Sequence, residues 1–391
     1  MVKPFQFARI PKIHFKNGII SELPGITKLY NGNIVLVTGQ NSFINSMKAH
    51  IFLESLHKMD IGYHLITVSD EPSPELIDAA VKMLNNEDVK VIIGIGGGSV
   101  LDAGKAISAM MYRTESVMKY LEGVGIKDHP GTKLPFIAVP TTSGTGSEAT
   151  KNAVISRIGK NGFKKSLRHD NFVPDIALVD PGLTLECPKE ITAASGMDCF
   201  TQLTEAYLSD KSSEYTDALA MEGIKAIRHS LIRSYVNGAD VEARTGMSFA
   251  ALTSGICLAN AGLGVVHGFA SSIGGMYNIP HGLVCGTLMA KANEINVREL
   301  RKKPADGTAL NKYAMLGKVF LDENGKTDDY YIDSFIDHLY KLNDELKLAG
   351  FEKFGVKSAD IGLICSVTEN KNNPVKLGVE EMAEIVISRL V

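Results

Sequence analysis

The chain has 391 residues, more than one ordinary compact core accommodates, so we expect two domains. Hydrophobic residues make up 45% and charged residues 22%, which is typical of a soluble globular enzyme and unlike disordered or fibrous chains. The 41 Lys and Arg residues nearly balance 44 Asp and Glu residues, for a net charge of −3. The chain therefore lacks the basic excess that would indicate nucleic acid or an anionic membrane as a partner.

The N-terminal sequence MVKPFQFARIPKIHF has no apolar segment of the kind a secretory signal requires, so we expect a cytoplasmic protein. The longest apolar stretch, residues 249–266, contains polar residues and three glycines. A buried helix pair explains this stretch better than a membrane span. Five cysteines without CxxC pairing are typical of a reduced intracellular protein whose thiols pack in the core.

The first half of the chain alternates short apolar runs with helical patterns. Ser73 and Pro74 mark the N-terminus of one such helix, because a hydroxyl cap followed by proline favours helix initiation. Apolar strands that alternate with helices predict a mostly parallel sheet with right-handed crossovers. The predicted buried strands are residues 34–38, 63–68, 89–94, 136–139 and 176–179.

The second half has a different character. Residues 193–207, 215–235 and 242–261 carry apolar side chains at helical spacing, and strand signals become scarce after about residue 188. The sequence therefore predicts an α/β domain over residues 1–185 and an all-helical domain over residues 186–391.

A triple-glycine segment, VKVIIGIGGGSVLDAGKAIS, reads as strand, tight turn and helix. Gly96, Gly97 and Gly98 have no Cβ, so the backbone can turn sharply and approach a phosphate. Ser99 lies at the helix N-terminus, where free amides and the helix dipole favour an anion. The segment matches neither GxGxxG nor GxxxxGK[ST], and a glycine-rich turn without a ligand is the alternative; we favour phosphate binding.

A second loop, PTTSGTGSEAT (residues 140–150), follows the strand predicted at residues 136–139. Alone, its hydroxyls and glycines fit a solvated loop. Two such loops at the C-terminal ends of parallel strands are where an open α/β sheet binds a nucleotide. Together the loops predict a nucleotide site.

Three residues of the helical half suggest a metal centre: Asp198, His267 and His281. Gln202 and Glu205 share the helix face of Asp198, and each histidine precedes a glycine. Carboxylate and imidazole donors suit Zn²⁺, Fe²⁺ or Mn²⁺. On spacing alone, however, hydrogen-bonded core histidines explain the pattern better than a metal site.

The segments GGGSVLDAGK, PTTSGTGSE, PDIALVDPGLT, SGMD, VHG and PHG occur in an order that resembles the iron-dependent (group III) alcohol dehydrogenases. The resemblance covers nearly the whole chain. It implies a dinucleotide-binding α/β domain followed by a helical domain, the fold shared with dehydroquinate synthase. It also implies a homodimer or higher homo-oligomer.

The resemblance implies a set of cofactor-binding residues. The phosphate loop becomes Gly97, Gly98 and Ser99, with Asp102 on the helix that follows. By the same resemblance, further residues match family positions near the cofactor: Ser73, Thr141, Thr142, Thr150, Lys164 and Leu183.

By the same resemblance, Gly39 stands at the position that indicates cofactor choice. NAD-preferring relatives often have Asp at this position, where it binds the ribose 2′-hydroxyl and repels a 2′-phosphate. Here no carboxylate is present, and Gln40, Asn41 and Ser42 offer donors to a phosphate. We expect NADP, with NAD as a second possibility; the alternative is that Gly39 simply ends a strand.

The family's metal ligands are an Asp, a His four residues later and two further His. Asp198, His267 and His281 match three of these positions, and Gln202 replaces the remaining histidine. The chain thus resembles a variant subgroup, with Fe²⁺ or Zn²⁺ held by Asp198, His267 and His281. Gln202 either binds the metal through its amide oxygen or holds a metal-bound water. Ser271 replaces another family histidine thought to assist proton transfer.

The resemblance implies a metal-dependent, NAD(P)-linked alcohol dehydrogenase or aldehyde reductase. Its catalytic residues are Asp198, His267 and His281, and its substrate is a small alcohol or aldehyde. One alternative is a glycerol-dehydrogenase-like or dehydroquinate-synthase-like metal enzyme. Another is a metal-free nucleotide-binding or scaffold protein, in which Gln202 and Ser271 are signs of decay.

Overall fold

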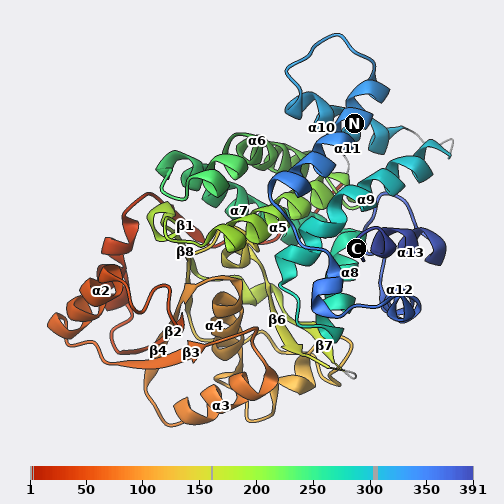
Figure 1. The fold of residues 1–391 in the computed structure, drawn as a ribbon. Helices are drawn as coiled ribbons and strands as arrows, with labels where there is room; N and C mark the ends of the chain where they lie inside the picture. The colour runs from red at the N-terminus through yellow and green to blue at the C-terminus, as the bar shows by residue number, and fades with distance from the viewer. Residues whose placement is uncertain (1, 3, 160–161, 303–306, 391) are drawn as a thin grey trace.

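A computed structural model describes residues 2, 4–159, 162–302 and 307–390. The described chain forms a parallel sheet followed by a helical region (Figure 1). The strands are β1 (Lys12–Phe15), β2 (Asn33–Gly39), β3 (Tyr63–Val68), β4 (Val89–Gly96), β5 (Phe136–Pro140), β6 (Asn152–Arg157), β7 (Phe163–Arg168) and β8 (Ile176–Val179). The helices of the first half are α1 (Leu23–Lys28), α2 (Met47–Lys58), α3 (Pro74–Leu84) and α4 (Gly98–Met110).

Six strands form one sheet in the order β1-β8-β5-β4-β2-β3, and all neighbouring pairs are parallel. The five strands expected from apolar runs are present. The structure adds β1 at the edge, and β6 pairs with β7 in a separate antiparallel hairpin. These three strands were not predicted, because their residues are partly exposed and mostly polar or alternating.

Helices cover both faces of the sheet. In β2, Val35 and Val37 pack with α3 and α4, whereas Ile34 and Leu36 pack with α1 and α2. This follows from the strand period of two, which sends successive side chains to opposite faces. Strands buried on both faces read as continuous apolar runs, which is why the sequence revealed them.

The strand order reverses between β2 and β4. From β2 the chain moves outward to β3, then returns to β4 on the other side of β2 and continues to β5. Such a reversal leaves a crevice at the carboxyl ends of the two strands, where open α/β sheets bind their ligands. Gly39 ends β2, and Gly97 follows β4 directly.

The second half is helical, and no strand follows β8 in the described part of the chain. Its helices are α5 (Lys189–Leu208), α6 (Glu214–Val236), α7 (Val241–Ala261), α8 (Val265–Met276), α9 (His281–Arg301), α10 (Thr308–Phe320), α11 (Asp328–Glu345), α12 (Ile361–Val367) and α13 (Val379–Ile387). The expected fold class, a parallel-sheet domain followed by a helical domain, is confirmed. The division expected between residues 185 and 186 falls between the 3₁₀ helix η5 (Pro181–Leu183) and α5.

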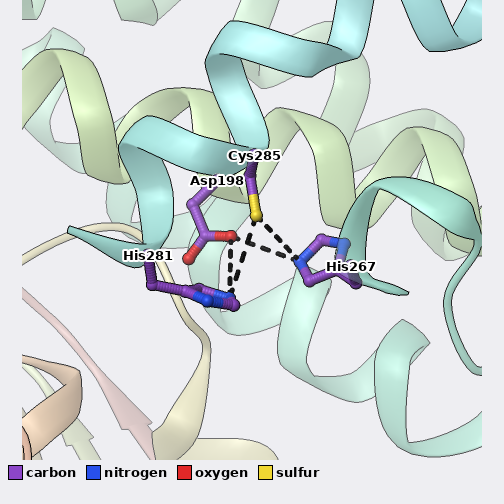
Figure 2. A group of neighbouring side chains, drawn as sticks. All are labelled: Asp198, His267, His281 and Cys285. Carbon is purple, nitrogen blue, oxygen red and sulfur yellow. Dashed lines mark hydrogen bonds and ion pairs between the residues drawn. The ribbon is translucent and has the colours of Figure 1, made fainter. Parts of the chain in front are cut away.

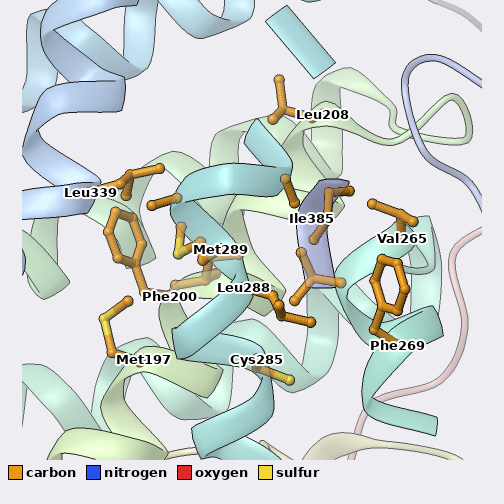
Figure 3. Packing of buried hydrophobic residues seen from close by; sticks show 14 of the residues in the cluster. Met197, Phe200, Leu208, Val265, Phe269, Cys285, Leu288, Met289, Leu339 and Ile385 are labelled. Atoms are coloured by element: carbon orange, nitrogen blue, oxygen red, sulfur yellow. The ribbon is translucent and has the colours of Figure 1, made fainter. Parts of the chain in front are cut away.

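The helical region has one large apolar core, drawn in part in Figure 3. Met197 and Phe200 of α5 meet Leu288 and Met289 of α9, and α8, α11 and α13 add the labelled Val265, Phe269, Leu339 and Ile385. Among the described helices, none is by itself long and apolar enough to cross a membrane; α7 and α8 pass that test only as a pair, which bends by 99°.

The two halves touch where α7 meets the loop after β5. A Cβ placed on Gly255 would lie 2.1 Å from the carbonyl oxygen of Gly146, and Gly146 itself has a positive φ of 62°. Ser143 and Ser248 share a hydrogen bond of 3.2 Å across the same contact. Glycine at 255 therefore permits a backbone approach that no other residue allows.

We expect Gly255→Ala to lower the melting temperature. The added methyl group must displace backbone, and overpacking of this kind costs about 1–3 kcal/mol. Gly362→Ala is the matched control, because a Cβ on this exposed helical glycine meets nothing within 4 Å. Thermal denaturation of both variants checks the prediction; equal melting temperatures would show that the contact is not tight.

Candidate metal centre and cofactor site

Three helices bring the predicted metal ligands together. Asp198 lies in α5, His267 in α8 and His281 at the start of α9 (Figure 2). His267 Nε2 lies 3.3 Å and His281 Nε2 3.7 Å from the same oxygen, Asp198 Oδ1. Side chains up to 83 residues apart in sequence (281 − 198) thus converge on one point.

The approach of α9 to α5 depends on a glycine. A Cβ on Gly282 would lie 2.3 Å from the carbonyl oxygen of Ala194 and 3.2 Å from Asp198 Cβ. Glycine after His281 therefore lets the first turn of α9 rest against α5, and this contact places the imidazole beside the carboxylate.

Glu205 orients one of the imidazoles. Its Oε2 accepts a hydrogen bond of 2.6 Å from His267 Nδ1, and its Oε1 accepts one of 2.7 Å from the backbone nitrogen of Val266. With the proton on Nδ1, the lone pair of Nε2 faces Asp198. Carboxylate–histidine pairs of this kind fix the tautomer of metal-ligating imidazoles.

The electrostatics of the centre fit a cation. Asp198 is 1% exposed and His267 3% exposed. Burial works to lower the pKa of His267, but Cys285, Asp198 and Glu205 outweigh it and raise the pKa, so the ring carries a proton that a bound cation would displace. Burial works to raise the pKa of Asp198, but the two imidazoles outweigh it and lower the pKa. Burial lowers the pKa of His281 to about 4, which keeps this imidazole neutral and free to coordinate. Converging electron-pair donors of this type are what Zn²⁺ or Fe²⁺ requires.

A fourth donor, Cys285, was not predicted. Its Sγ lies 3.6 Å from His267 Nε2 and 3.8 Å from His281 Nε2, and the donor atoms of all four residues lie within 4.8 Å of one another. The cysteines of this chain were expected to pack in the core. The signal that could have found Cys285 is its position four residues after His281, which places both on one face of a helix.

Gln202 makes a different contact. Its Oε1 accepts a hydrogen bond of 2.9 Å from Ser254 Oγ of α7. The side chain is 2% exposed, and this bond satisfies its amide oxygen. Ser271 donates to the carbonyl oxygen of His267, one turn earlier, at 2.9 Å.

Several predicted cofactor residues lie along the carboxyl edge of the sheet. They are Gly39 at the end of β2 and Ser42 after it, Gly97, Gly98 and Ser99 after β4, Thr141 and Thr142 after β5, and Leu183 after β8. Gly97 caps the N-terminus of α4, so free backbone amides point to the edge where the strand order reverses. The loops occupy the place where such sheets bind a dinucleotide.

Asp102 and Thr150 belong to a buried network that joins the two loops. Asp102 accepts hydrogen bonds from Ser147 Oγ and, at 3.0 Å, from the backbone nitrogen of Val154. Lys105 donates to Thr150 Oγ1 at 2.9 Å and to the carbonyl oxygen of Ser147 at 2.8 Å. In this structure their side chains hold the second loop against α4.

Ser73 and Lys164 also have protein partners. Ser73 Oγ caps α3 by accepting from the backbone nitrogen of Leu76 at 3.2 Å, as its hydroxyl and the following proline predicted. Lys164 of β7 pairs with Glu71, which also accepts a hydrogen bond of 2.6 Å from Ser156. The loop before α3 and the β6–β7 hairpin are thereby joined.

Sequence comparison agrees with this architecture. Residues 11–181 match the family described as iron-containing alcohol dehydrogenase, and residues 192–390 match its C-terminal domain. Alcohol dehydrogenase 4 of Saccharomyces cerevisiae is 31% identical over 327 residues, 81% of this chain and 80% of the yeast protein. The NADPH-dependent butanol dehydrogenase of Clostridium saccharobutylicum is 30% identical over 387 residues, 95% of each chain.

Solved structures show the same fold. The alcohol dehydrogenase from Oenococcus oeni superposes with a TM-score of 0.86 at 30% identity, covering 99% of this chain and 100% of the other. The two family matches together span nearly all of the chain, and the predicted resemblance to the iron-dependent alcohol dehydrogenase family is confirmed. This chain belongs to the iron-containing alcohol dehydrogenase family.

Proposed function

We propose that this alcohol dehydrogenase holds one divalent cation through Asp198, His267 and His281, and that NADP(H) is its preferred cofactor. Family membership makes the chain an oxidoreductase for alcohols and aldehydes that uses a nicotinamide cofactor and a metal. The observation that carries the proposal is the convergence of the two Nε2 atoms on Asp198 Oδ1, at 3.3 and 3.7 Å.

A divalent cation in such a site supplies Lewis acidity toward a substrate oxygen, and the nicotinamide exchanges the hydride. The protein's own residues prepare the site. Asp198 supplies negative charge, Glu205 holds His267 in the tautomer that presents Nε2, and the low pKa of His281 keeps its ring unprotonated. The surrounding apolar core excludes water, which strengthens these interactions.

Two alternatives lose support. A lyase or polyol dehydrogenase of the same fold would share the cation site, but both matched families are alcohol dehydrogenases. A metal-free scaffold protein has no use for four converging donor groups, three of them on buried residues, because burying unpaired charge is costly. A small alcohol or aldehyde substrate and a homo-oligomeric assembly remain part of the proposal.

The preference for NADP rests on the end of β2. Gly39 provides no carboxylate to repel a 2′-phosphate, and Ser42 stands three residues later in the same loop. A Cβ on Gly39 would make only ordinary contacts, with Ser42 Oγ and Val100 Cγ2 each at 3.9 Å. Packing therefore leaves room for a larger side chain at position 39, and it does not explain why this residue is glycine.

We expect His267→Ala to abolish turnover and to lower bound metal while leaving NADPH binding within about twofold of wild type, because the cofactor loops lie on the sheet. Metal analysis, steady-state assay and NADPH fluorescence check the three quantities. His229→Ala, on an exposed face of α6, is the control. Retained turnover with unchanged metal content would refute the assignment.

We expect Glu205→Gln to weaken metal affinity by about 10–100-fold, as loss of an outer-shell carboxylate usually does. The amide still accepts the Val266 backbone hydrogen bond but no longer carries the charge that stabilises the Nδ1 proton. Competitive titration with a chelator measures the affinity. Glu222→Gln, exposed on α6, should leave it unchanged, and an equal loss in both variants would contradict the role of Glu205.

We expect Gly39→Asp to shift the NADPH/NADH ratio of kcat/KM toward NADH by at least about tenfold, or about 1.4 kcal/mol. The new carboxylate would accept a hydrogen bond from the ribose 2′-hydroxyl and repel the 2′-phosphate. Gly39→Ala adds the Cβ without the charge and should leave the ratio unchanged. If both variants keep the wild-type ratio, this position does not decide cofactor choice.

A further inference from the structure

We propose that Cys285, and not Gln202, is the fourth protein ligand of the cation, and that the resulting Asp-His-His-Cys site selects Zn²⁺. The inference rests on the proposed metal centre. It concerns a residue outside the predicted ligand set, four positions beyond His281 on α9.

The distances fit a shared cation. Tetrahedral zinc, with bonds of about 2.0 Å to nitrogen or oxygen and about 2.3 Å to sulfur, requires neighbouring donor atoms to lie about 3.3–3.6 Å apart. The contacts of Cys285 Sγ with the two Nε2 atoms measure 3.6 and 3.8 Å, and those of Asp198 Oδ1 measure 3.3 and 3.7 Å. Four edges of the donor tetrahedron are thus already within a few tenths of an ångström of coordination.

The direction of the thiol argues against a mere packing role. Cys285 is 0% exposed and belongs to the apolar core, where Figure 3 shows it at the end of a row formed by Leu288 and Met289. A packing thiol would point among carbon atoms. Figure 2 shows instead that the sulfur points toward both imidazoles and the carboxylate of Asp198.

Helix geometry makes the substitution possible. His281 and Cys285 are separated by four residues on α9, so their side chains project from the same face. Asp198 and Gln202 have the same spacing on α5, but the amide oxygen of Gln202 is held by Ser254 of α7. Cys285 of α9 therefore supplies the donor atom that Gln202 of α5 does not provide.

Charge balance favours the thiolate. Coordination breaks the S–H bond of Cys285, forms a sulfur–metal bond and releases one proton to solvent. Two negative ligands, Asp198 and the thiolate, then neutralise a divalent cation within its own coordination shell, whereas Gln202, a neutral amide, would add no negative charge to that shell. Thiolate ligands also favour Zn²⁺ over Mn²⁺, which prefers oxygen donors.

The test uses the full-length protein loaded with Co²⁺ or Zn²⁺. We expect thiolate-to-cobalt charge-transfer absorption in the near ultraviolet, and X-ray absorption of the zinc form with one sulfur at about 2.3 Å. Both signals should disappear in Cys285→Ser, and its Zn²⁺ affinity should fall by at least about 100-fold, more than for an outer-shell change. The Mn²⁺ affinity should fall less.

Cys257→Ser is the matched control. Its thiol is equally buried but donates to the carbonyl oxygen of Thr216 at 3.7 Å, away from the metal centre, so both signals should persist. The wild-type spectra test the inference even if Cys285→Ser fails to fold.

The outcomes separate the two proposals. Metal bound through nitrogen and oxygen alone, and lost in His267→Ala, overturns the role of Cys285 and leaves the proposed function standing. Wild-type protein that binds neither cation, or binds them equally after His267→Ala, overturns the metal centre itself and the role of Cys285 with it.

Discussion

A buried carboxylate facing two imidazoles is the constraint on which the helical half depends. Asp198 and His267 lie within an apolar core, where unpaired polar groups cost several kcal/mol in lost hydration. Glu205 fixes one ring, and Gly282 lets α9 rest against α5. In the proposed metal centre a cation would compensate these donors, and metal binding and the packing of α5, α8 and α9 would then stabilise each other.

The sheet half meets this centre through the loop after β5. The loop contacts α4 through the Lys105 network, which includes Ser147 and Thr150, and contacts α7 where Gly146 meets Gly255. The same α7 holds Gln202 of α5 through Ser254. A continuous set of contacts thus runs from the glycine loop that follows β4 to the helix that carries Asp198, and it fixes the carboxyl edge of the sheet relative to Asp198.

Sequence patterns identified most readily the strands that are buried on both faces of the sheet. The strands β2, β4, β5 and β8 read as apolar runs because both faces of the sheet are covered there. β3 lies at the edge with one face exposed, and it was recognised from its own apolar and β-branched residues. The edge strand β1 and the β6–β7 hairpin have partly exposed, polar or alternating residues, so they carry no comparable signal. Ser73 was identifiable as a helix cap because capping is local in sequence.

The sequence by itself determined the family, the order of sheet and helices, and the residues Asp198, His267 and His281, because collinear motifs and local periodicity need no knowledge of distant contacts. Only the tertiary structure placed Cys285 beside the imidazoles and turned Gln202 toward Ser254. Both side chains sit four residues from a ligand on their own helices, so spacing could not choose between them. The packing angles of α5, α7 and α9 decide which one faces the centre, and those angles arise from contacts between residues far apart in the chain.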